Sequence, residues 1–176
     1  MHRRQILATG GLLLAGLATP SIIRAKARVQ EIELRSDVDG AKVWFDPIGV
    51  LVEPGTIIRW IIRENVHTTT AYHPDNDNHA LRIPSNATAW DSGYLVNPGD
   101  HFEIELSVPG VYDYFCAPHE EAGMVGRIIV GNPSSLNLKY LQNQNIKNPD
   151  WEDVPVEAQQ AFPSIEEIMR DGAVRV

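Results

Sequence analysis

The chain has 176 residues but a single cysteine, Cys116, and it has fewer basic than acidic side chains. One cysteine excludes a framework of internal disulfides and leaves the thiol for chemistry or for burial. The rest of the composition is ordinary for a globular protein, which excludes disordered and collagen-like chains. The sequence has no internal repeats, and its length suits one domain with appendages and a core large enough to fold alone.

An apolar run near the N-terminus, residues 6–18, is weakened by several glycines, and an uncleaved anchor would extend over residues 6–23. It follows Arg3-Arg4 and precedes Ala25-Lys26-Ala27, which offers a small-x-small cleavage site, so residues 1–27 are predicted to be an export signal peptide. The paired arginines resemble a twin-arginine signal, and we therefore expect a periplasmic or otherwise extracytoplasmic protein. An uncleaved membrane anchor is the alternative, although 18 residues are barely enough to cross a bilayer. With a cleaved signal, no membrane span is expected.

Basic side chains are scarce once the signal is set aside. Residues 1–27 hold four basic side chains and no acidic one, so the remaining chain has 11 basic and 23 acidic residues, a formal charge of −12. Such a surface should repel nucleic acid and anionic membranes and attract basic partners.

Seven short apolar segments separated by Pro- and Gly-containing turns are predicted to be strands. They are residues 29–34, 41–45, 48–52, 56–63, 102–106, 111–116 and 125–130. Many short strands without a long helical period favour an all-β fold, an antiparallel β-sandwich. Residues 56–63 are apolar almost throughout, which is typical of a strand covered on both faces.

The character of the chain changes after Gly131, where Asn and Gln become frequent. Two short helical patterns follow, and the second is predicted to begin at Ser164, which forms a capping box with Glu167, and to end at Gly172. Apolar side chains in this tail suggest that it packs on another part of the protein: Trp151, Phe162, Ile165 and Ile168. The predicted organisation is an export signal (1–27), one β-sandwich domain (28–131) and a partly helical C-terminal extension (132–176).

Three residues with metal-binding side chains lie close together at and just after the end of the sixth predicted strand. Cys116, His119 and Met124 are spaced three and then five residues apart, so one tight turn can present a thiolate, an imidazole and a thioether to the same soft metal ion. In that strand Cys116 alternates with Asp113, which is expected to prefer water, so Cys116 is expected to point into the core. Gly123 can supply a positive φ before Met124.

A second imidazole must come from elsewhere in the chain. His67 is favoured because it directly follows the long strand at 56–63, while His101 begins an alternating strand. His73 and His79 lie in an Asp- and Asn-rich stretch that is typical of a solvated turn. This stretch could also form a second, adventitious metal site, although a plain polar loop is the simpler interpretation.

The combination of one thiolate, two imidazoles and a weak axial thioether is typical of blue-copper electron-transfer sites. Copper alternates between Cu(I), which accepts soft ligands at low coordination, and Cu(II), which prefers more and harder ligands. A trigonal set of two His and one Cys with a long thioether bond compromises between the two states. Its geometry changes little when an electron arrives, and this keeps electron transfer fast.

Residues 110–119, continuing through Ala122-Gly123-Met124-Val125-Gly126 to Val130, resemble the copper loop of plastocyanins and pseudoazurins. Further segments resemble bacterial and archaeal members of this family: residues 45–47, 53–55, 90–93 and 97–99. The resemblance covers about residues 40–131 and implies a cupredoxin Greek-key β-sandwich with one type 1 copper ion. By position it implies four ligands: His67, Cys116, His119 and Met124. The sequence departs from the family at Thr68, where Asn often braces the ligand loop, and Thr can still form hydrogen bonds through its hydroxyl.

The leading functional hypothesis is a soluble carrier that moves single electrons between redox proteins and is not itself an enzyme. An apolar rim at the edge of His119 is expected to be the electron exit and to consist of Ala117, Pro118, Ala122 and Met124. Glu120 and Glu121 flank this rim and should favour a partner with a basic docking surface, cytochrome-like or a copper or haem enzyme. Phe115, turned outward, could join a docking patch unless the tail covers it.

Two other classes of function remain open. A copper storage or delivery protein would expose its ligands and exchange the metal readily, whereas a buried cysteine on a preorganised loop favours retention. An enzyme with a Cys-His nucleophile pair would leave Met124 and the loop spacing unexplained.

Overall fold

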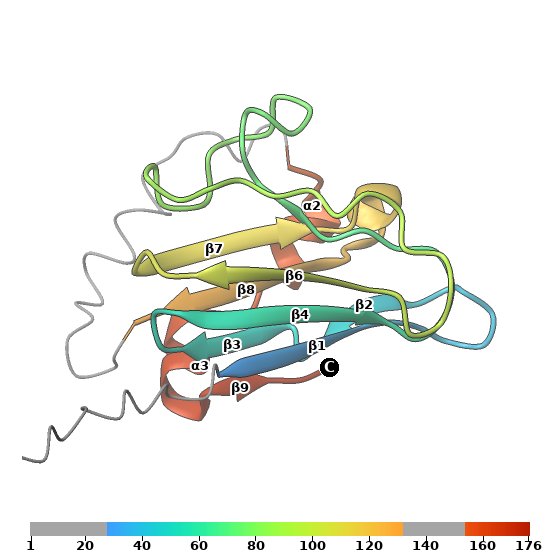
Figure 1. Cartoon of the computed structure of the whole chain (residues 1–176). Coiled ribbons are helices and arrows are strands. Elements are labelled where there is room, and N and C mark those ends of the chain that lie inside the picture. Colours follow the sequence, from blue (N-terminus) through green and yellow to red (C-terminus); the bar gives the residue numbers. More distant parts are fainter. Residues whose placement is uncertain (1–27, 132–153) are drawn as a thin grey trace, which may run out of the picture.

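The computed structural model describes residues 28–131 and 154–176 and shows two β-sheets packed face to face (Figure 1). The first sheet, in the order β2-β1-β4-β6, contains β1 (Val29–Ser36), β2 (Val43–Asp46), β4 (Thr56–Ile62) and β6 (His101–Leu106). The second, in the order β5-β7-β8-β3-β9, contains β3 (Gly49–Val52), β5 (Thr70–Ala71), β7 (Gly110–Phe115), β8 (Val125–Val130) and β9 (Ala173–Val174). The predicted sandwich is confirmed, and β5 and β9 are additions that the sequence patterns missed. The predicted signal and the Asn- and Gln-rich segment after residue 131 lie outside the described residues.

The strand pairing is mixed, so the expectation of a purely antiparallel sandwich was wrong. β1 runs parallel to β4 and β3 runs parallel to β8, whereas the other neighbours are antiparallel. Turn residues show where a strand ends, but they do not show which strand it will lie beside. Here the chain passes between the two sheets before it returns, and this produces parallel neighbours.

The inner faces of both sheets form the core around a group of aromatic rings. Trp60 on β4 lies 5.4 Å from Tyr114 on β7 and 5.5 Å from Trp90, measured between ring centroids. The outer face of β4 is not covered by another layer. Arg59 lies on this face with its side chain 35% exposed, and it forms ion pairs with Glu31 and Glu103. The prediction that residues 56–63 are covered on both faces was therefore wrong.

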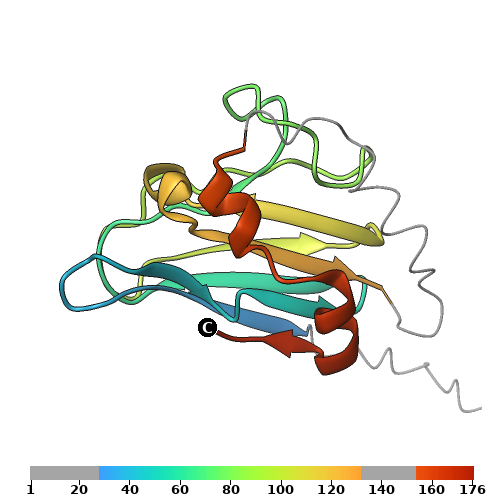
Figure 2. The ribbon, with the colours of Figure 1, turned by 180° about the vertical axis from the view of Figure 1, so that it is seen from behind.

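The strands that are buried on both faces are β7 and β8, because the C-terminal extension lies over the outer face of their sheet (Figure 2). The extension forms α2 (Val156–Ala161), α3 (Ile165–Asp171) and the edge strand β9. As predicted, Ser164 caps α3 by accepting a hydrogen bond from the backbone N–H of Glu167, and Gly172 ends the helix. The expected packing of the tail is confirmed for Phe162, which packs near Phe115, and for Ile165 and Ile168 of α3, which pack with Val111 and Ile129. Trp151 lies outside the described residues.

This covering reverses one expectation about β7. Asp113 does not face water, since its side chain is completely buried and binds the guanidinium groups of Arg82 and Arg127. Burial by itself would raise the pKa of the Asp113 carboxyl, but the attraction of Arg127 and Arg82 outweighs this effect and lowers the pKa. Cys116 still faces the core between the sheets as predicted, since it belongs to the same buried cluster as Tyr112 and Tyr114.

Candidate metal centre

The metal-binding side chains gather at one end of the sandwich, where β7 ends and β8 begins. Cys116 directly follows β7, and the 3₁₀ segment η1 (Ala117–Ala122) carries His119. Pro118 lies at the start of η1, and Gly123 ends it in the left-handed conformation with φ +80°. The turn is held by two backbone hydrogen bonds, from Cys116 N–H to Met124 O at 3.0 Å and from Met124 N–H to His119 O at 3.1 Å.

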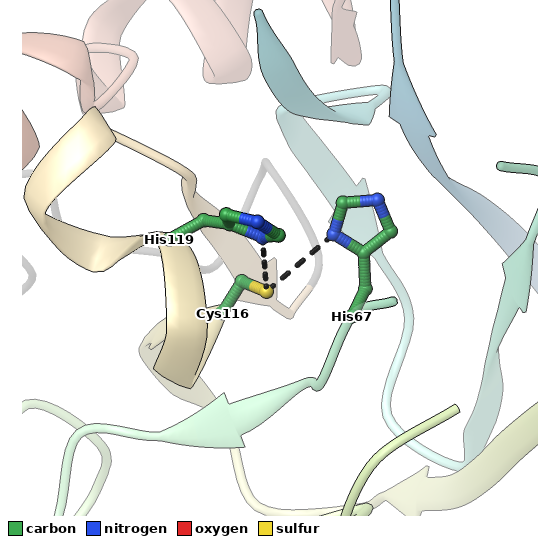
Figure 3. Close-up of side chains that lie close together, drawn as sticks. All are labelled: His67, Cys116 and His119. Atoms are coloured by element: carbon green, nitrogen blue, oxygen red, sulfur yellow. Dashed lines mark hydrogen bonds between the residues drawn. The ribbon is translucent and has the colours of Figure 1, made fainter. Parts of the chain in front are cut away.

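His67 reaches the same point from the segment between β4 and β5. Its backbone pairs with Leu95 in an isolated antiparallel bridge, and two hydrogen bonds of 2.8 and 3.2 Å hold the pair together. Figure 3 shows the imidazoles of His67 and His119 on either side of the Cys116 sulfur. The structure therefore brings His67 to Cys116, as predicted, although 48 residues separate them in the chain.

The distances fit one soft metal ion. Cys116 Sγ lies 3.6 Å from His67 Nδ1 and 3.4 Å from His119 Nδ1. An ion bonded at about 2.0 Å to nitrogen and about 2.3 Å to sulfur would, at trigonal angles, hold these atoms roughly 3.7 Å apart. Among the described residues, these three form the only group of three or more His, Cys, Asp or Glu side chains close enough to share an ion. The second, adventitious site around His73 and His79 is therefore not formed there.

Met124, the fourth predicted ligand, lies beside this group. Its side chain is completely buried and belongs to the same core cluster as Cys116. Its backbone is hydrogen-bonded to Cys116 and to His119, so the residue is fixed next to both.

Burial sets the protonation of the candidate ligands. It raises the pKa of the Cys116 thiol to about 11. Burial and repulsion from His119 lower the pKa of His67 to about 4, and burial lowers the pKa of His119. At neutral pH both imidazoles are thus neutral and ready to bind a metal, whereas the thiol keeps its proton until a cation replaces it.

Thr68 braces the ligand loop in place of the Asn that is frequent in plastocyanin-like sequences. Its Oγ1 accepts a hydrogen bond of 2.8 Å from Ala117 N–H, and its own N–H donates to Cys116 Sγ at 3.3 Å. The expected bond through the hydroxyl is thus present. Thr70 and Asp91 continue this series of hydrogen bonds, and no sequence pattern indicates them, because only their spatial neighbours give them a role.

The expected rim around His119 is only partly formed. Ala117, Pro118 and Ala122 are exposed and His119 is partly exposed, but Met124 is completely buried and does not reach the surface. Met124 is buried because its side chain packs into the sandwich core.

The acidic residues beside the rim differ from each other. Glu120 accepts a hydrogen bond of 2.6 Å from the hydroxyl of Tyr72 and lies 3.0 Å from His79 Nε2, so only Glu121 is exposed. His79 is not part of a plain solvated turn, since its ring stacks on Phe115 at 4.3 Å between centroids. Phe115 is itself only 2% exposed, which removes it from the candidate docking surface.

Comparison with known proteins agrees with this geometry. A family model described as copper binding proteins, plastocyanin/azurin family, matches residues 32–131. The chloroplastic plastocyanin of Tetradesmus obliquus is 31% identical over 131 residues, which cover 72% of this chain and 81% of that protein. The chloroplastic plastocyanin of Hordeum vulgare is 31% identical over 130 residues, which cover 70% of this chain and 71% of that protein.

Among solved structures, native pseudoazurin from Hyphomicrobium denitrificans aligns with a TM-score of 0.56 and 19% identity. The alignment covers 81% of this chain and 96% of that chain. At this identity the likeness shows the fold alone, and it confirms the sandwich expected from the sequence.

Proposed function

The chain belongs to the plastocyanin/azurin family of copper-binding proteins, with one type 1 copper ion as cofactor, and on this premise we propose which residues bind the ion and how the protein is used. The proposed ligands are His67, Cys116, His119 and Met124. Cupredoxins of this kind are electron carriers, and we infer that this one passes single electrons between two redox proteins outside the cytoplasm.

The observation that carries the proposal is the close approach of one sulfur and two imidazole nitrogens at 3.4 and 3.6 Å inside a buried site. When bound, copper supplies a one-electron couple between Cu(I) and Cu(II). The chain holds the donor atoms in fixed places: η1 and Gly123 fix the loop, and the bridge to Leu95 fixes His67. Because the ligands are held by backbone hydrogen bonds and core packing, they need to move little when the charge at the site changes.

The chain also keeps water away from the sulfur. Cys116 and His67 are 0% exposed, whereas His119 is partly exposed between Ala117, Pro118 and Ala122. The edge of His119 is therefore the proposed point where electrons enter and leave. This apolar surface can approach a partner closely without leaving charges unpaired.

Charge supports a basic partner. Residues 28–176 carry a formal charge of −12, and Glu121 is exposed beside the rim. A cytochrome-like protein or a copper or haem enzyme with a basic docking face would be attracted, while nucleic acid would be repelled. The attraction should weaken as salt is added.

We propose an extracytoplasmic location from the signal-like residues 1–27. Residues 28–131 would then form the copper domain, and residues 132–176 its extension. In the described part of the chain, no helix is both long enough and apolar enough to cross a membrane.

The two alternative functions fit the site less well. Copper delivery requires ligands that a receiving protein can reach, and three of the four proposed ligands are completely buried: His67, Cys116 and Met124. A nucleophilic cysteine requires an accessible thiolate, but burial raises the pKa of Cys116 to about 11. Ligand burial thus disfavours copper delivery, and the raised thiol pKa disfavours nucleophilic catalysis.

The test is the visible absorption spectrum of the protein loaded with Cu(II), before and after ascorbate. We expect an intense thiolate-to-copper band that disappears on reduction. Cys116→Ser should abolish the band and His67→Ala should strongly alter it, whereas the matched control His101→Ala should leave it unchanged. A pale spectrum from the unmodified protein would refute the ligand set and reopen the delivery function.

A further inference from the structure

A chain of side-chain hydrogen bonds connects an exposed carboxylate to the loop that carries Cys116. Thr70 Oγ1 donates to Asp91 Oδ1 at 2.9 Å, and Thr70 Oγ1 lies 3.0 Å from Thr68 Oγ1. Thr68 Oγ1 accepts the backbone N–H of Ala117 at 2.8 Å. Asp91 is exposed, but Thr68 and Thr70 are only 2% and 4% exposed, so the chain runs from the surface into the interior.

The donor and acceptor of every hydrogen bond in this series follow from the number of protons that each group can donate. Each threonine hydroxyl has one proton to donate, and an ionised carboxylate can only accept. The proton of Thr70 is used on Asp91, so the hydroxyl proton of Thr68 must be donated to Thr70. The remaining lone pair of Thr68 accepts from Ala117, whose N–H can only donate. The three hydrogen bonds therefore run in one direction, from Ala117 N–H through the hydroxyls of Thr68 and Thr70 to the carboxylate of Asp91.

We propose that Asp91 and Thr70 are positioning residues for the metal centre, acting through Thr68 on the loop that begins at Cys116. This inference rests on the proposed ligand set. The carboxylate polarises both hydroxyls in turn, which makes Thr68 Oγ1 a stronger acceptor for Ala117 N–H than an isolated hydroxyl would be. Low local polarity strengthens the effect, because little water reaches the two threonines.

Thr68 connects this series of hydrogen bonds to the proposed metal ligands. Thr68 directly follows His67, and its N–H donates to Cys116 Sγ at 3.3 Å. Fixing the Thr68 hydroxyl therefore fixes the residue that touches both the sulfur and the first turn of the ligand loop. The backbone around it is independently paired, with Thr70 bridged to Asp91 and β5 paired with β7, so removal of a hydroxyl should not dismantle the strand.

The test uses protein expressed from the full chain, with the substitutions Thr70→Val, Thr70→Ser and Asp91→Asn. In the metal-free protein, the Ala117 amide proton should shift upfield in NMR spectra of Thr70→Val and exchange with solvent roughly fivefold to tenfold faster. Thr70→Ser, which keeps the hydroxyl, should match the unmodified protein. Asp91→Asn should shift the same proton in the same direction by a smaller amount, because it keeps an acceptor oxygen but removes the charge.

A double substitution distinguishes an effect that passes through the hydrogen bonds of Thr70 and Thr68 from a general effect of removing a negative charge. In the Thr70→Val background, Asp91→Asn should have no further effect on the Ala117 amide, because the connection is already broken. Asp100→Asn removes another carboxylate of this loop region, a partly exposed one that is not part of these hydrogen bonds, and should leave the amide unchanged. Additive effects, or an equal effect of Asp100→Asn, would overturn the proposal, as would an unchanged amide in both single variants.

The copper-loaded protein provides the second measurement. The thiolate-to-copper absorption of Thr70→Val should change in position or intensity and that of Thr70→Ser should not. The amide measurement needs no metal, so it can fail while the spectrum of the unmodified protein still supports the ligand set. Conversely, a pale unmodified protein would refute the proposed function whatever the amide shows.

Discussion

Replacing Asp113 by alanine should strongly destabilise the protein, although the residue lies outside the metal site. Its carboxylate accepts hydrogen bonds of 2.6 and 3.0 Å from Arg82 and of 2.7 and 3.1 Å from Arg127. Arg127 also donates to Pro163 O at 2.7 Å, and both guanidinium groups face the ring of Phe162 at 5.5 and 5.0 Å. Asp113 thus joins β7, β8 and the C-terminal extension.

The size of the effect follows from the charges that would be left behind. Removing one partner of a buried ion pair costs about 3–5 kcal/mol, because the remaining charge stays buried without compensation. Asp113→Ala would leave two guanidinium groups, which are 1% and 9% exposed, so we expect a loss of about 4–5 kcal/mol. For a chain of this size, such a loss lowers the melting temperature by roughly 10–15 °C.

Thermal and urea denaturation followed by circular dichroism would measure this loss, with metal-free and copper-loaded protein in parallel. Asp171→Ala is the matched control, since Asp171 pairs with Arg170 at the surface and its removal should leave the midpoint nearly unchanged. Limited proteolysis should cut the extension faster in Asp113→Ala than in the control. A loss below about 1 kcal/mol would refute the argument, because it would mean that the two arginines find equivalent partners without Asp113.

Three further predictions concern the metal site. At pH 7.5, binding of Cu(II) should release about one proton per ion, since the pKa of the Cys116 thiol is raised to about 11 and the imidazoles are neutral. Calorimetry in two buffers with different ionisation enthalpies measures the number of protons released. Binding without proton release would exclude a thiolate ligand. Metal-free protein should lose stability as the pH falls from 6.5 to 4, by at most about 3 kcal/mol, because over this range His67 is protonated in the unfolded chain and stays neutral in the folded chain. A urea midpoint that is constant over this pH range would contradict this prediction. Gly123→Ala should cost about 1–2 kcal/mol from its φ of +80° and also change the copper spectrum, because its Cβ would lie 3.2 Å from Glu157 O of α2. Gly172→Ala, with φ +75° and no atom within 4 Å of the added Cβ, should share the strain but leave the spectrum unchanged.

The sequence by itself determined the features that depend on neighbouring residues. Cys116, His119 and Met124 lie on one short turn, so their spacing alone predicted that they could meet at one point. The cap of α3 was predicted for the same reason, since Ser164 and Glu167 are one helical turn apart. Apolar segments between Pro- and Gly-containing turns also located the main strands, because turn residues mark where a strand ends.

The tertiary structure alone decided which distant segments meet. His67 was one of several candidate histidines, and the bridge to Leu95 and the pairing of β5 with β7 are what carry its segment to Cys116. Asp113 was expected to face water because a carboxylate is costly to bury alone. The two arginines that make its burial favourable lie 31 residues before it and 14 residues after it, so no local pattern could reveal them. Local spacing fixes what a turn can present, but the burial of a charge depends on partners that only the folded chain brings together.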